Sequence, residues 1–570
     1  MANINEWLTI DKTSGTGNAQ ITLSASSSQE LNDRVASLRI NGKGIVSLLN
    51  VRQLAFVPTF SILPNPIHFT SDGSEIEVTI TGNASWELIA DDWVTISDKY
   101  GNAYGETITK TIKISVGVNT GDFRQGVLKV KSFSSDVVYA SVAITQDAFN
   151  VEDYVQMVYE TKSDNETLYL FNKNAKNGYL TKNVGSTSSA IWRNSDNVKV
   201  IIIDGVVYDV ASYSSTSPLR DGFVIPNMGE HNVYVKFTDN IIRGTRPSSG
   251  SSSPAFRSNP SLKSIIIPSN YQIASNGYGY GLFFECSSLQ SVNMNGVLDY
   301  ISDSSTDKGQ DVSATFYGCT SLETVLNFRL QDGVIRKRLC NGRTNLKTFT
   351  IYNKETPNKV EEYAFYNCKN LHNDFIVNYV HNKGVSSIGK YAFYNCLLFE
   401  GENGILKLDG VTLANNSFAN CTKLKTVYAE KVSEAFTNCG ETLYLTGTDP
   451  WGIENSTFKK VVCMQLLNNY STNWLSSPYL EEIEFMSEEQ QDMRYEMTSG
   501  TDWNGKFDDI PNLKKLIFHS MLPPIVNHNT LADVPYNGTL VYPNGADYSQ
   551  MLSTEPYYLG YYGWTGSPTL

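Results

Sequence analysis

Cysteine is the residue type in this chain whose spacing could carry chemistry, as a metal ligand, a nucleophile or a disulfide partner. Eight cysteines fall between Cys286 and Cys463 of the 570 residues, and none belongs to a C-x-x-C pair. Neither a zinc ribbon nor a thioredoxin-like motif is therefore available. Six of the eight are the last residue of a shared Phe-x-x-Cys motif, which we call the frame, in LFFEC, TFYGC, AFYNC (twice), SFANC and AFTNC. A small apolar thiol repeated at every turn fits burial better than catalysis, and a disulfide ladder between coils is the alternative.

Histidine is the second residue type that could hold a metal ion or move a proton. None of the six histidines has an H-x-x-x-H partner or belongs to the H-E-x-x-H signature of a zinc hydrolase. His372 and His381 flank Asp374, and the three could build a metal site, although solvated loop histidines are the plainer interpretation. We expect no metal site. The histidines are His68, His231, His372, His381, His519 and His528.

Adjacent acidic residues could supply the two carboxylates, about 5 to 10 Å apart, that glycoside hydrolysis needs. Neighbouring residues of a strand point to opposite faces of the sheet, however, so adjacency alone does not pair them. We therefore expect no catalytic residues, no enzymatic activity and no cofactor. The acidic pairs are Asp91-Asp92, Glu361-Glu362, Glu481-Glu482 and Asp508-Asp509.

A glycine-rich stretch, NGYGYG at 276–281, superficially resembles a phosphate-binding loop. It lacks the Lys-Ser/Thr and the preceding buried strand of a P-loop. As an insertion, the stretch should display Tyr271, Tyr278 and Tyr280 on flexible backbone, and tyrosine is an amphipathic contact residue that costs little entropy to order. Tyr271, Tyr278 and Tyr280 are the predicted binding residues, against the alternative of an ordinary surface loop.

Composition excludes several classes of partner. The net charge of −13 and the isoelectric point near 5.1 would repel a nucleic-acid backbone, and no basic run opposes them. No apolar stretch of about eighteen residues is present, so we expect no membrane span. The first residues, MANINEWLTIDKTSG, lack the basic and apolar segments of a secretory signal, which predicts a cytosolic product. A chain that begins after a removed signal would look the same.

The Phe-x-x-Cys frame belongs to a longer repeat. A leucine, or its stand-in Phe399, follows at intervals of 24 to 33 residues, which is the period of a one-coil-per-repeat solenoid. The Leu-x-x-Val/Ile-x-Ile pattern alternates apolar and polar residues, as a strand does. Each coil should therefore add one short strand to a parallel stack. In RLCNGRTNL the frame puts Cys340 in the Phe position and Arg343 in the Cys position, which predicts a repacked or bulged coil.

The frame I-G-x-x-A-F-x-x-C-x-x-L resembles the BspA-type leucine-rich repeat, known from bacterial surface and secreted proteins that act in adhesion. The resemblance covers about 250–520. The segment NGTLVYPNGADYSQMLSTEPYYLGYYGWTG at 537–566 resembles the closing segment of such arrays, and a terminal repeat needs a cap to seal its outer face.

The N-terminal region holds a different repeat. Trp7-Leu8-Thr9-Ile10, Arg34 and Gln53 recur in the same order as Trp93-Val94-Thr95-Ile96, Arg124 and Gln146, with similar spacing. Short alternating strands with Gly, Asn and Asp between them indicate a small antiparallel sandwich. The pattern resembles the BACON domain, an immunoglobulin-like module of gut Bacteroidetes proteins and of crAss-like phages, which implies carbohydrate or mucin binding, or spacing.

The first of these units lacks the leading strands of the second, so we expect an open edge that a partner covers. Between the two repeat systems, alternating strands and an Asp204-Gly205 corner indicate a bridging β domain. The predicted fold class is mainly β, with immunoglobulin-like sandwiches and a leucine-rich repeat solenoid with a C-terminal cap. The predicted domains are a truncated BACON-like sandwich at 1–57, a BACON-like sandwich at 58–148, the bridging domain at 149–247, repeats at 248–520 and the cap at 521–570.

These resemblances imply a non-enzymatic virion protein of a crAss-like or related phage, a fibre or appendage made in the host cytoplasm. Its N-terminal domain would attach to other virion proteins, and the array would bind host-surface or mucin glycans or proteins. The alternative is a secreted or surface-attached bacterial adhesin without its signal peptide. Nucleic acid and membrane are not expected partners, and the oligomeric state, including a homo-oligomer, stays open.

Overall fold

The computed structural model divides the chain into two compact units, residues 1–151 and 152–570, each described by itself. The structure describes residues 2–28, 30–171, 198–208, 222–237, 239–242, 255–256, 258–273, 282–297, 315–449, 451–467, 475–494, 507, 509–527, 530–531 and 534–569. No helix in these ranges is long and apolar enough to cross a bilayer.

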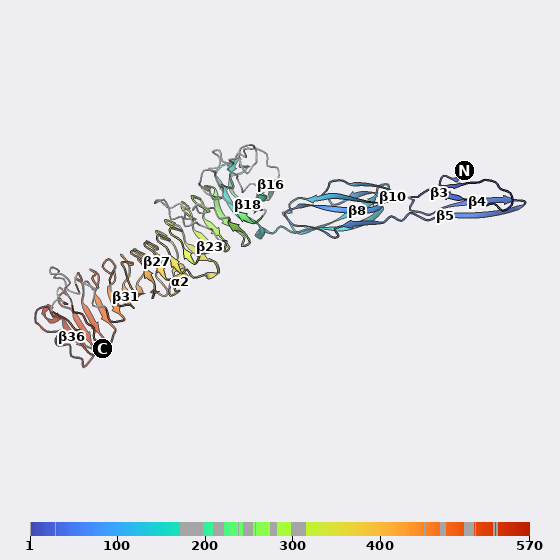
Figure 1. The fold of residues 1–570 in the computed structure, drawn as a ribbon. Helices are drawn as coiled ribbons and strands as arrows, with labels where there is room; N and C mark the ends of the chain where they lie inside the picture. The colour runs from blue at the N-terminus through green and yellow to red at the C-terminus, as the bar shows by residue number, and fades with distance from the viewer. Residues whose placement is uncertain are drawn as a thin grey trace, which may run out of the picture. The chain divides into compact units, whose positions relative to one another are not determined.

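The first unit holds two groups of antiparallel strands. Residues 2–53 form a small three-stranded sheet and a separate two-stranded ribbon, coloured dark blue in Figure 1. The strands are β1 (Ala2–Asn5), β2 (Leu8–Ile10) and β3 (Leu23–Ala25) in the sheet, and β4 (Arg34–Gly42) and β5 (Ile45–Gln53) in the ribbon.

Residues 60–146 form the second sandwich from seven linked strands, in the strand order β7-β12-β11-β8-β10-β9, with β6 paired to β8. Alternation of side chains along the long strand β8 puts Val78, Ile80, Trp86 and Leu88 inside, and all four are buried. The strands are β6 (Phe60–Leu63), β7 (Ile67–Phe69), β8 (Ser74–Ile89), β9 (Val94–Ile96), β10 (Tyr100–Val116), β11 (Arg124–Ser132) and β12 (Val138–Gln146).

The second unit begins with an antiparallel sheet that runs directly into the first coils. Strand β13 pairs with β18 on one edge and with β20, the first repeat strand, on the other. The bridging segment therefore covers the open end of the array with hydrogen-bonded strands. The sheet order is β16 (Val206–Tyr208), β15 (Val198–Ile203), β18 (Gly229–Phe237), β13 (Val155–Thr161), β20 (Leu262–Ile266), β22 (Ser291–Asn293), β23 (Thr324–Phe328) and β25 (Thr348–Ile351).

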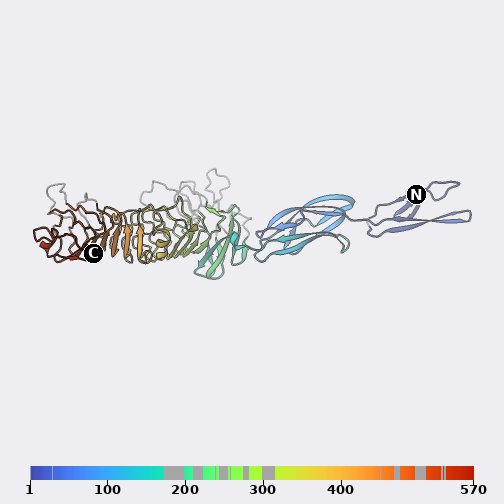
Figure 2. The ribbon, with the colours of Figure 1, turned by 90° about the horizontal axis from the view of Figure 1, so that it is seen from below.

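Beyond β25 the array continues as stacked parallel strands, seen as rungs in Figure 1 and again in Figure 2. The register is in step from coil to coil: Val427 lies opposite Leu443, which lies opposite Val461. The order is β28 (Ile405–Leu408), β30 (Thr426–Ala429), β31 (Thr442–Leu445), β32 (Lys460–Cys463), β33 (Glu482–Phe485), β34 (Lys515–Phe518), β35 (Thr539–Tyr542) and β36 (Thr565–Pro568).

Short strands on a second wall, and one helix, complete the coils. A four-stranded parallel sheet links β24 (Val334–Ile335), β26 (Lys359–Val360), β27 (Ser387–Ile388) and β29 (Thr412–Leu413). Two small pairs join β14 (Glu166–Leu168) to β17 (Phe223–Ile225) and β19 (Ile241–Ile242) to β21 (Gln272–Ile273). Helix α2 (Asn373–Tyr379) interrupts one coil, and 3-10 turns lie at Val151–Asp153, Tyr352–Lys354 and Leu559–Tyr562.

The turn inside Phe-x-x-Cys explains why Asn and Gly recur there. The residue before the cysteine has a positive φ in each described copy, a conformation that Gly and Asn adopt with little strain. In the Cys340 coil, Gly342 takes the same position before Arg343. The residues and φ values are Glu285 at 61°, Gly318 at 77°, Gly342 at 75°, Asn367 at 60°, Asn395 at 59°, Asn420 at 60° and Asn438 at 56°.

Candidate functional site

The repeated cysteines are interior residues. All eight thiols are buried and free, so the predicted burial is confirmed and no disulfide ladder forms. The six frame cysteines also have a defined role, because each thiol donates a hydrogen bond to a backbone carbonyl of the preceding coil. Cys319, for example, donates to the carbonyl of Phe283 at 3.0 Å, and Cys421 to that of Phe393 at 3.1 Å.

These thiols are poor nucleophiles and poor metal ligands. Burial raises the pKa of Cys319 and of Cys368 to about 12, and it raises the pKa of Cys396 as well. The thiolate, which does the chemistry of cysteine, is therefore scarce at neutral pH. Phenylalanine rings stack beside the thiols from coil to coil, with 5.7 Å between the ring centroids of Phe365 and Phe393 and an angle of 6°.

In the irregular coil, Arg343 replaces the cysteine as the donor of the hydrogen bond to a carbonyl of the preceding coil. Its guanidinium is largely buried and donates from Nη1 to the carbonyl of Phe316 at 3.2 Å, where the frame would place a thiol. Cys340, in the Phe position, is fully buried, and its carbonyl accepts from the thiol of Cys368 at 3.1 Å. The coil is repacked as predicted, with an arginine in place of the cysteine.

The candidate metal ligands and catalytic acids are separated or neutralised. Among the described residues, no group of three or more His, Cys, Asp or Glu side chains could hold a metal ion. His372 and Asp374 are exposed, whereas His381 is buried, contrary to its interpretation as a solvated loop residue, and accepts from the backbone N–H of Lys407 at 3.2 Å.

Two acidic residues of strand β33, Glu482 and Glu484, lie on the same face of the sheet. Lys460 Nζ lies 2.6 Å from both Glu482 and Glu484, and Nε2 of His519 lies 2.9 Å from Glu484. Burial opposes ionisation of Glu484, but the hydrogen bonds from Lys460 and His519 outweigh it and lower the pKa of that carboxyl. With its pKa lowered, Glu484 is a poor candidate for the protonated general acid that a glycosidase requires, and Lys460 bridges it to Glu482.

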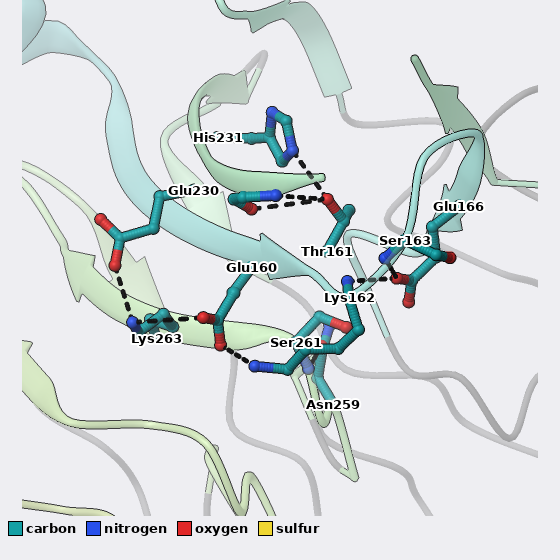
Figure 3. A network of polar contacts seen from close by, with 11 residues as sticks. Glu160, Thr161, Lys162, Ser163, Glu166, Glu230, His231, Asn259, Ser261 and Lys263 are labelled. Carbon is teal, nitrogen blue, oxygen red and sulfur yellow. Dashed lines mark hydrogen bonds and ion pairs between the residues drawn. The ribbon is translucent and has the colours of Figure 1, made fainter. Parts of the chain in front are cut away.

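A hydroxyl, an imidazole and a carboxylate lie in a line at the start of the second unit. The hydroxyl of Thr161 is 2.9 Å from Nε2 of His231, whose Nδ1 is 2.7 Å from Asp204, a relay-like order of groups. Figure 3 shows Thr161 and His231 at close range. Thr161 is only 3% exposed and His231 5%, and the hydroxyl also contacts backbone atoms of Asn227 and Gly229. A nucleophile enclosed in this way has no room for substrate, so the trio is a clamp between strands.

The same region ties the bridging sheet to the first repeat. Lys263 of β20 lies 2.7 Å from Glu230 of β18 and 3.8 Å from Glu160 of β13, which is also paired with Lys162 (Figure 3). The hydrogen bond that Lys263 donates to Glu230 is the main cause that raises the pKa of Lys263. The network is a structural joint between the bridging sheet and the first repeat strand.

The predicted binding tyrosines are not an exposed group. Tyr271 is buried, with its hydroxyl donating to the carbonyl of Asp153 at 3.1 Å and accepting from the N–H of Phe237 at 3.3 Å. Its expected placement on a displayed loop is wrong, because the ring packs into the core of the bridging sheet. Tyr278 and Tyr280 lie outside the described residues.

Four other tyrosines gather on the outside of the array, and we call them the tyrosine cluster: Tyr363, Tyr366, Tyr391 and Tyr394. The rings of Tyr366 and Tyr394 stack at 4.9 Å and 9°, and those of Tyr363 and Tyr391 at 5.2 Å and 30°. Tyr391 and Tyr394 meet at 5.6 Å within one coil. All four side chains are half-buried, so part of each ring reaches solvent.

Cations flank the tyrosine cluster. The guanidinium carbon of Arg338 lies 4.9 Å from the ring centre of Tyr363, and Nζ of Lys390 lies 5.2 Å from that of Tyr391. Tyr363 and Tyr391 also adopt positive φ values of 57° and 56°, where the next coil has Asn416 at 59°. A positive φ is strained for a residue as bulky as tyrosine. The contacts of the tyrosine rings, and not the backbone conformation, therefore explain why tyrosine occupies these two positions.

Comparisons with known proteins agree with the two repeat systems. A family model described as "BspA type Leucine rich repeat region" matches six copies over residues 248–311 and 333–467. The BACON model, described as "Putative binding domain, N-terminal", matches residues 2–54 and 77–147. The first BACON match thus begins about five residues before Trp7, whereas the second begins 16 residues before Trp93.

No curated protein matches the chain. Among solved structures, a Bacteroides ovatus GH5 xyloglucanase in complex with a XXXG heptasaccharide is 18% identical over 16% of this chain and 20% of that chain, with a TM-score of 0.14. A TM-score this low supports no inference about the fold or the function of this chain. The sandwich geometry, the stacked coils and the family matches together identify the chain as one that joins BACON domains to a BspA-type leucine-rich repeat region.

Proposed function

We propose that the protein is a non-enzymatic adhesion protein whose repeat array binds glycans or proteins through the tyrosine cluster. BACON domains and BspA-type repeats are typical of bacterial surface or secreted proteins and suggest protein or glycan binding. The tyrosine cluster is the observation that carries the proposal, because it is an ordered aromatic surface that the packing of the coils does not require.

Stacking prepares these rings for contact. A tyrosine offers an apolar ring and a polar hydroxyl, which suit the CH faces and hydroxyl groups of a sugar as well as a protein surface. Because each ring is already held by its neighbour, little side-chain entropy remains to be lost on binding. Burial, and then the neighbouring Tyr394, raises the pKa of Tyr366, so its hydroxyl stays protonated and can donate.

The absence of catalysis is part of the proposal. It is supported by the bridged Glu482 and Glu484, the enclosed hydroxyl of Thr161 and the raised pKa of the buried cysteines. Incubation with mucin glycans followed by analysis of released sugar tests it directly. We expect no product, and product formation would require a catalytic site.

The finer proposal places the protein in the virion of a crAss-like or related phage, as a fibre or appendage that attaches through its N-terminal domain and binds host-surface or mucin glycans or proteins. It rests on the BACON resemblance, which extends to such phages. The alternative is a secreted or surface-attached bacterial adhesin. Antibody labelling of purified phage particles and of intact bacteria in electron micrographs separates the two, because label on particles supports the virion and label on uninfected cells supports the adhesin.

The binding proposal is tested by a pair of double variants. Tyr366→Ala with Tyr394→Ala should weaken binding to mucin glycans roughly 5- to 30-fold, the usual effect of removing aromatic contacts worth about 1–2 kcal/mol. The matched control is Tyr428→Ala with Tyr444→Ala, which removes another stacked pair, 4.3 Å apart, on strands β30 and β31. If both double variants lost the same affinity, or if only the control lost affinity, the strands β30 and β31 would contribute to binding at least as much as the tyrosine cluster. Either result would contradict the proposal.

A further inference from the structure

The two BACON units share one polar motif, which aligns them residue by residue. Arg34 lies 4.7 Å above Trp7 and donates from Nε to Gln53 at 2.9 Å. Arg124 lies 4.5 Å above Trp93 and donates from Nε to Gln146, also at 2.9 Å. Strand β4 of the first unit therefore corresponds to β11 of the second, and β5 corresponds to β12.

The corresponding strands have different neighbours. In the second unit β11 pairs with β8, where Val130 lies opposite Leu88, and β12 pairs with β7, where Ile144 lies opposite Ile67. In the first unit β4 and β5 pair with one another and with no other strand of the described chain (Figure 1). Each strand of the ribbon thus presents a free edge of N–H and C=O groups, which is a template for a further strand.

The inner faces of the two corresponding strand pairs differ in how much of their apolar side chains is exposed. Val130 and Val142 of the second unit are 0% and 2% exposed, whereas the corresponding Ile40 and Leu49 are 47% and 43% exposed. At the ribbon's tip Ile45 is 74% exposed. Removing such apolar surface from water is favourable, so the ribbon presents a surface that gains stability from an occupant.

Charge indicates which occupant fits. Residues 34–53 carry four cations, Arg34, Arg39, Lys43 and Arg52, and no acid; Asp33, just before them, pairs with Arg52, which leaves three cations without an acidic partner in the described part of this unit. A second copy of the ribbon would bring like charges together. Strand β8, which pairs with the corresponding edge in the second unit, carries Glu75, Glu77 and Glu87 and no Lys or Arg, and Glu87 lies directly opposite Lys131 of β11. The strands of the second sandwich are also already paired and none is spare.

We propose that the first BACON unit is completed by a strand donated by another polypeptide, an acidic segment with apolar side chains at alternate positions. The donated strand adds to the edge of β4 as β8 adds to β11, and it places an apolar side chain beside Ile40, as Leu88 lies opposite Val130. This assignment deepens the proposed attachment through the N-terminal domain and rests on it, and it is independent of ligand binding by the array.

The test uses a fluorescent peptide with the sequence of residues 80–92, ITGNASWELIADD, which contains Trp86, Leu88 and Glu87. The peptide should bind the full chain with one-to-one stoichiometry in a fluorescence anisotropy titration. Ile40→Asp should weaken binding by about tenfold or more, because it places a carboxylate where the apolar contact forms. Leu48→Asp is the matched control: Leu48 is 65% exposed on the opposite face of the ribbon, and its change should leave binding within about twofold.

A second peptide, carrying Leu88→Asp, should lose most of its binding. Circular dichroism of both chain variants checks that they fold, and sedimentation of the full chain gives its oligomeric state. Absence of peptide binding to a folded monomer would overturn the proposal. So would a dimer that Ile40→Asp dissociates, because the occupant would then be a second copy. Mucin binding is measured separately, so failure of this proposal and failure of the array's binding role are distinguishable.

Discussion

One wall of the array presents two faces that are built from adjacent residues. In YAFYNC, Phe393 and Cys396 point inward and are fully buried, whereas Tyr391 and Tyr394 are half-buried on the outside. The inner positions repeat from coil to coil, because each ring and thiol must stack on the next. The outer position varies more: in the slot of Tyr394, three other coils carry an aromatic residue (Phe284, Tyr317 and Tyr366) and three do not (Asn341, Ala419 and Thr437), and Phe284 and Ala419 are themselves buried. Stacking therefore specifies the interior and leaves the exterior available for recognition.

The sharpest test of this contrast changes two neighbouring residues. Phe393→Ala should destabilise the array by about 3–5 kcal/mol, because it removes a buried ring that stacks on Phe365 at 5.7 Å and on Phe418 at 5.3 Å. Tyr394→Ala should cost about 1 kcal/mol, since only part of its ring is buried. Thermal unfolding of the two variants measures the difference, and equal losses would remove the distinction between the faces.

The buried thiols predict a pH dependence that the outer wall does not share. The pKa of Cys368 is about 12 in the fold, against 9.0 for an ordinary thiol, so only the unfolded chain ionises this group between those values. The native state binds more protons there, and stability is complete below pH 9.0 and falls as pH rises toward 12. Each ionising thiol should contribute a slope of about 1.4 kcal/mol per pH unit.

Urea unfolding at stepped pH measures this slope, with Cys368→Ser as the matched variant. A serine does not titrate in this range, so the variant should lose less stability per pH unit than the parent chain. Identical slopes would mean that Cys368 is not a buried, protonated thiol in the native molecule.

A smaller effect is expected at the irregular coil. Arg343→Ala should cost about 1–2 kcal/mol, because the carbonyl of Phe316 loses its side-chain donor and part of a buried stem is removed. Arg343→Cys restores the frame and should recover part of that loss. If the cysteine variant is no more stable than the alanine variant in thermal unfolding, the carbonyl bond is not what the Cys position provides.

The sequence predicted the interior better than the exterior, for a physical reason. Repetition revealed Phe393 and Cys396, because burial restricts those positions to few residue types, and it also paired Trp7 with Trp93. The thiol-to-carbonyl bonds were not foreseen, since they depend on the offset between coils. Tyr271 was placed on a loop because a glycine-rich stretch follows it, whereas its hydroxyl bonds to Asp153 and Phe237 in the core.

The sequence does contain a signal for the tyrosine cluster. The segment AFYNC occurs twice, and its tyrosine repeats together with its cysteine. The clamp of Thr161, His231 and Asp204 had no such signal, because its residues come from three separate strands or turns. Contacts between segments far apart in the chain depend on strand register, which a single sequence does not give.

Counting reactive thiols in the native protein tests the central claim most directly. If the cysteines are protonated interior residues that bond to the carbonyls of neighbouring coils, a thiol reagent at pH 8 should leave all eight unmodified on the timescale on which the urea-unfolded chain reacts completely. Rapid modification of any frame cysteine in the folded chain would contradict the stacked interior and, with it, the assignment of recognition to the outer wall.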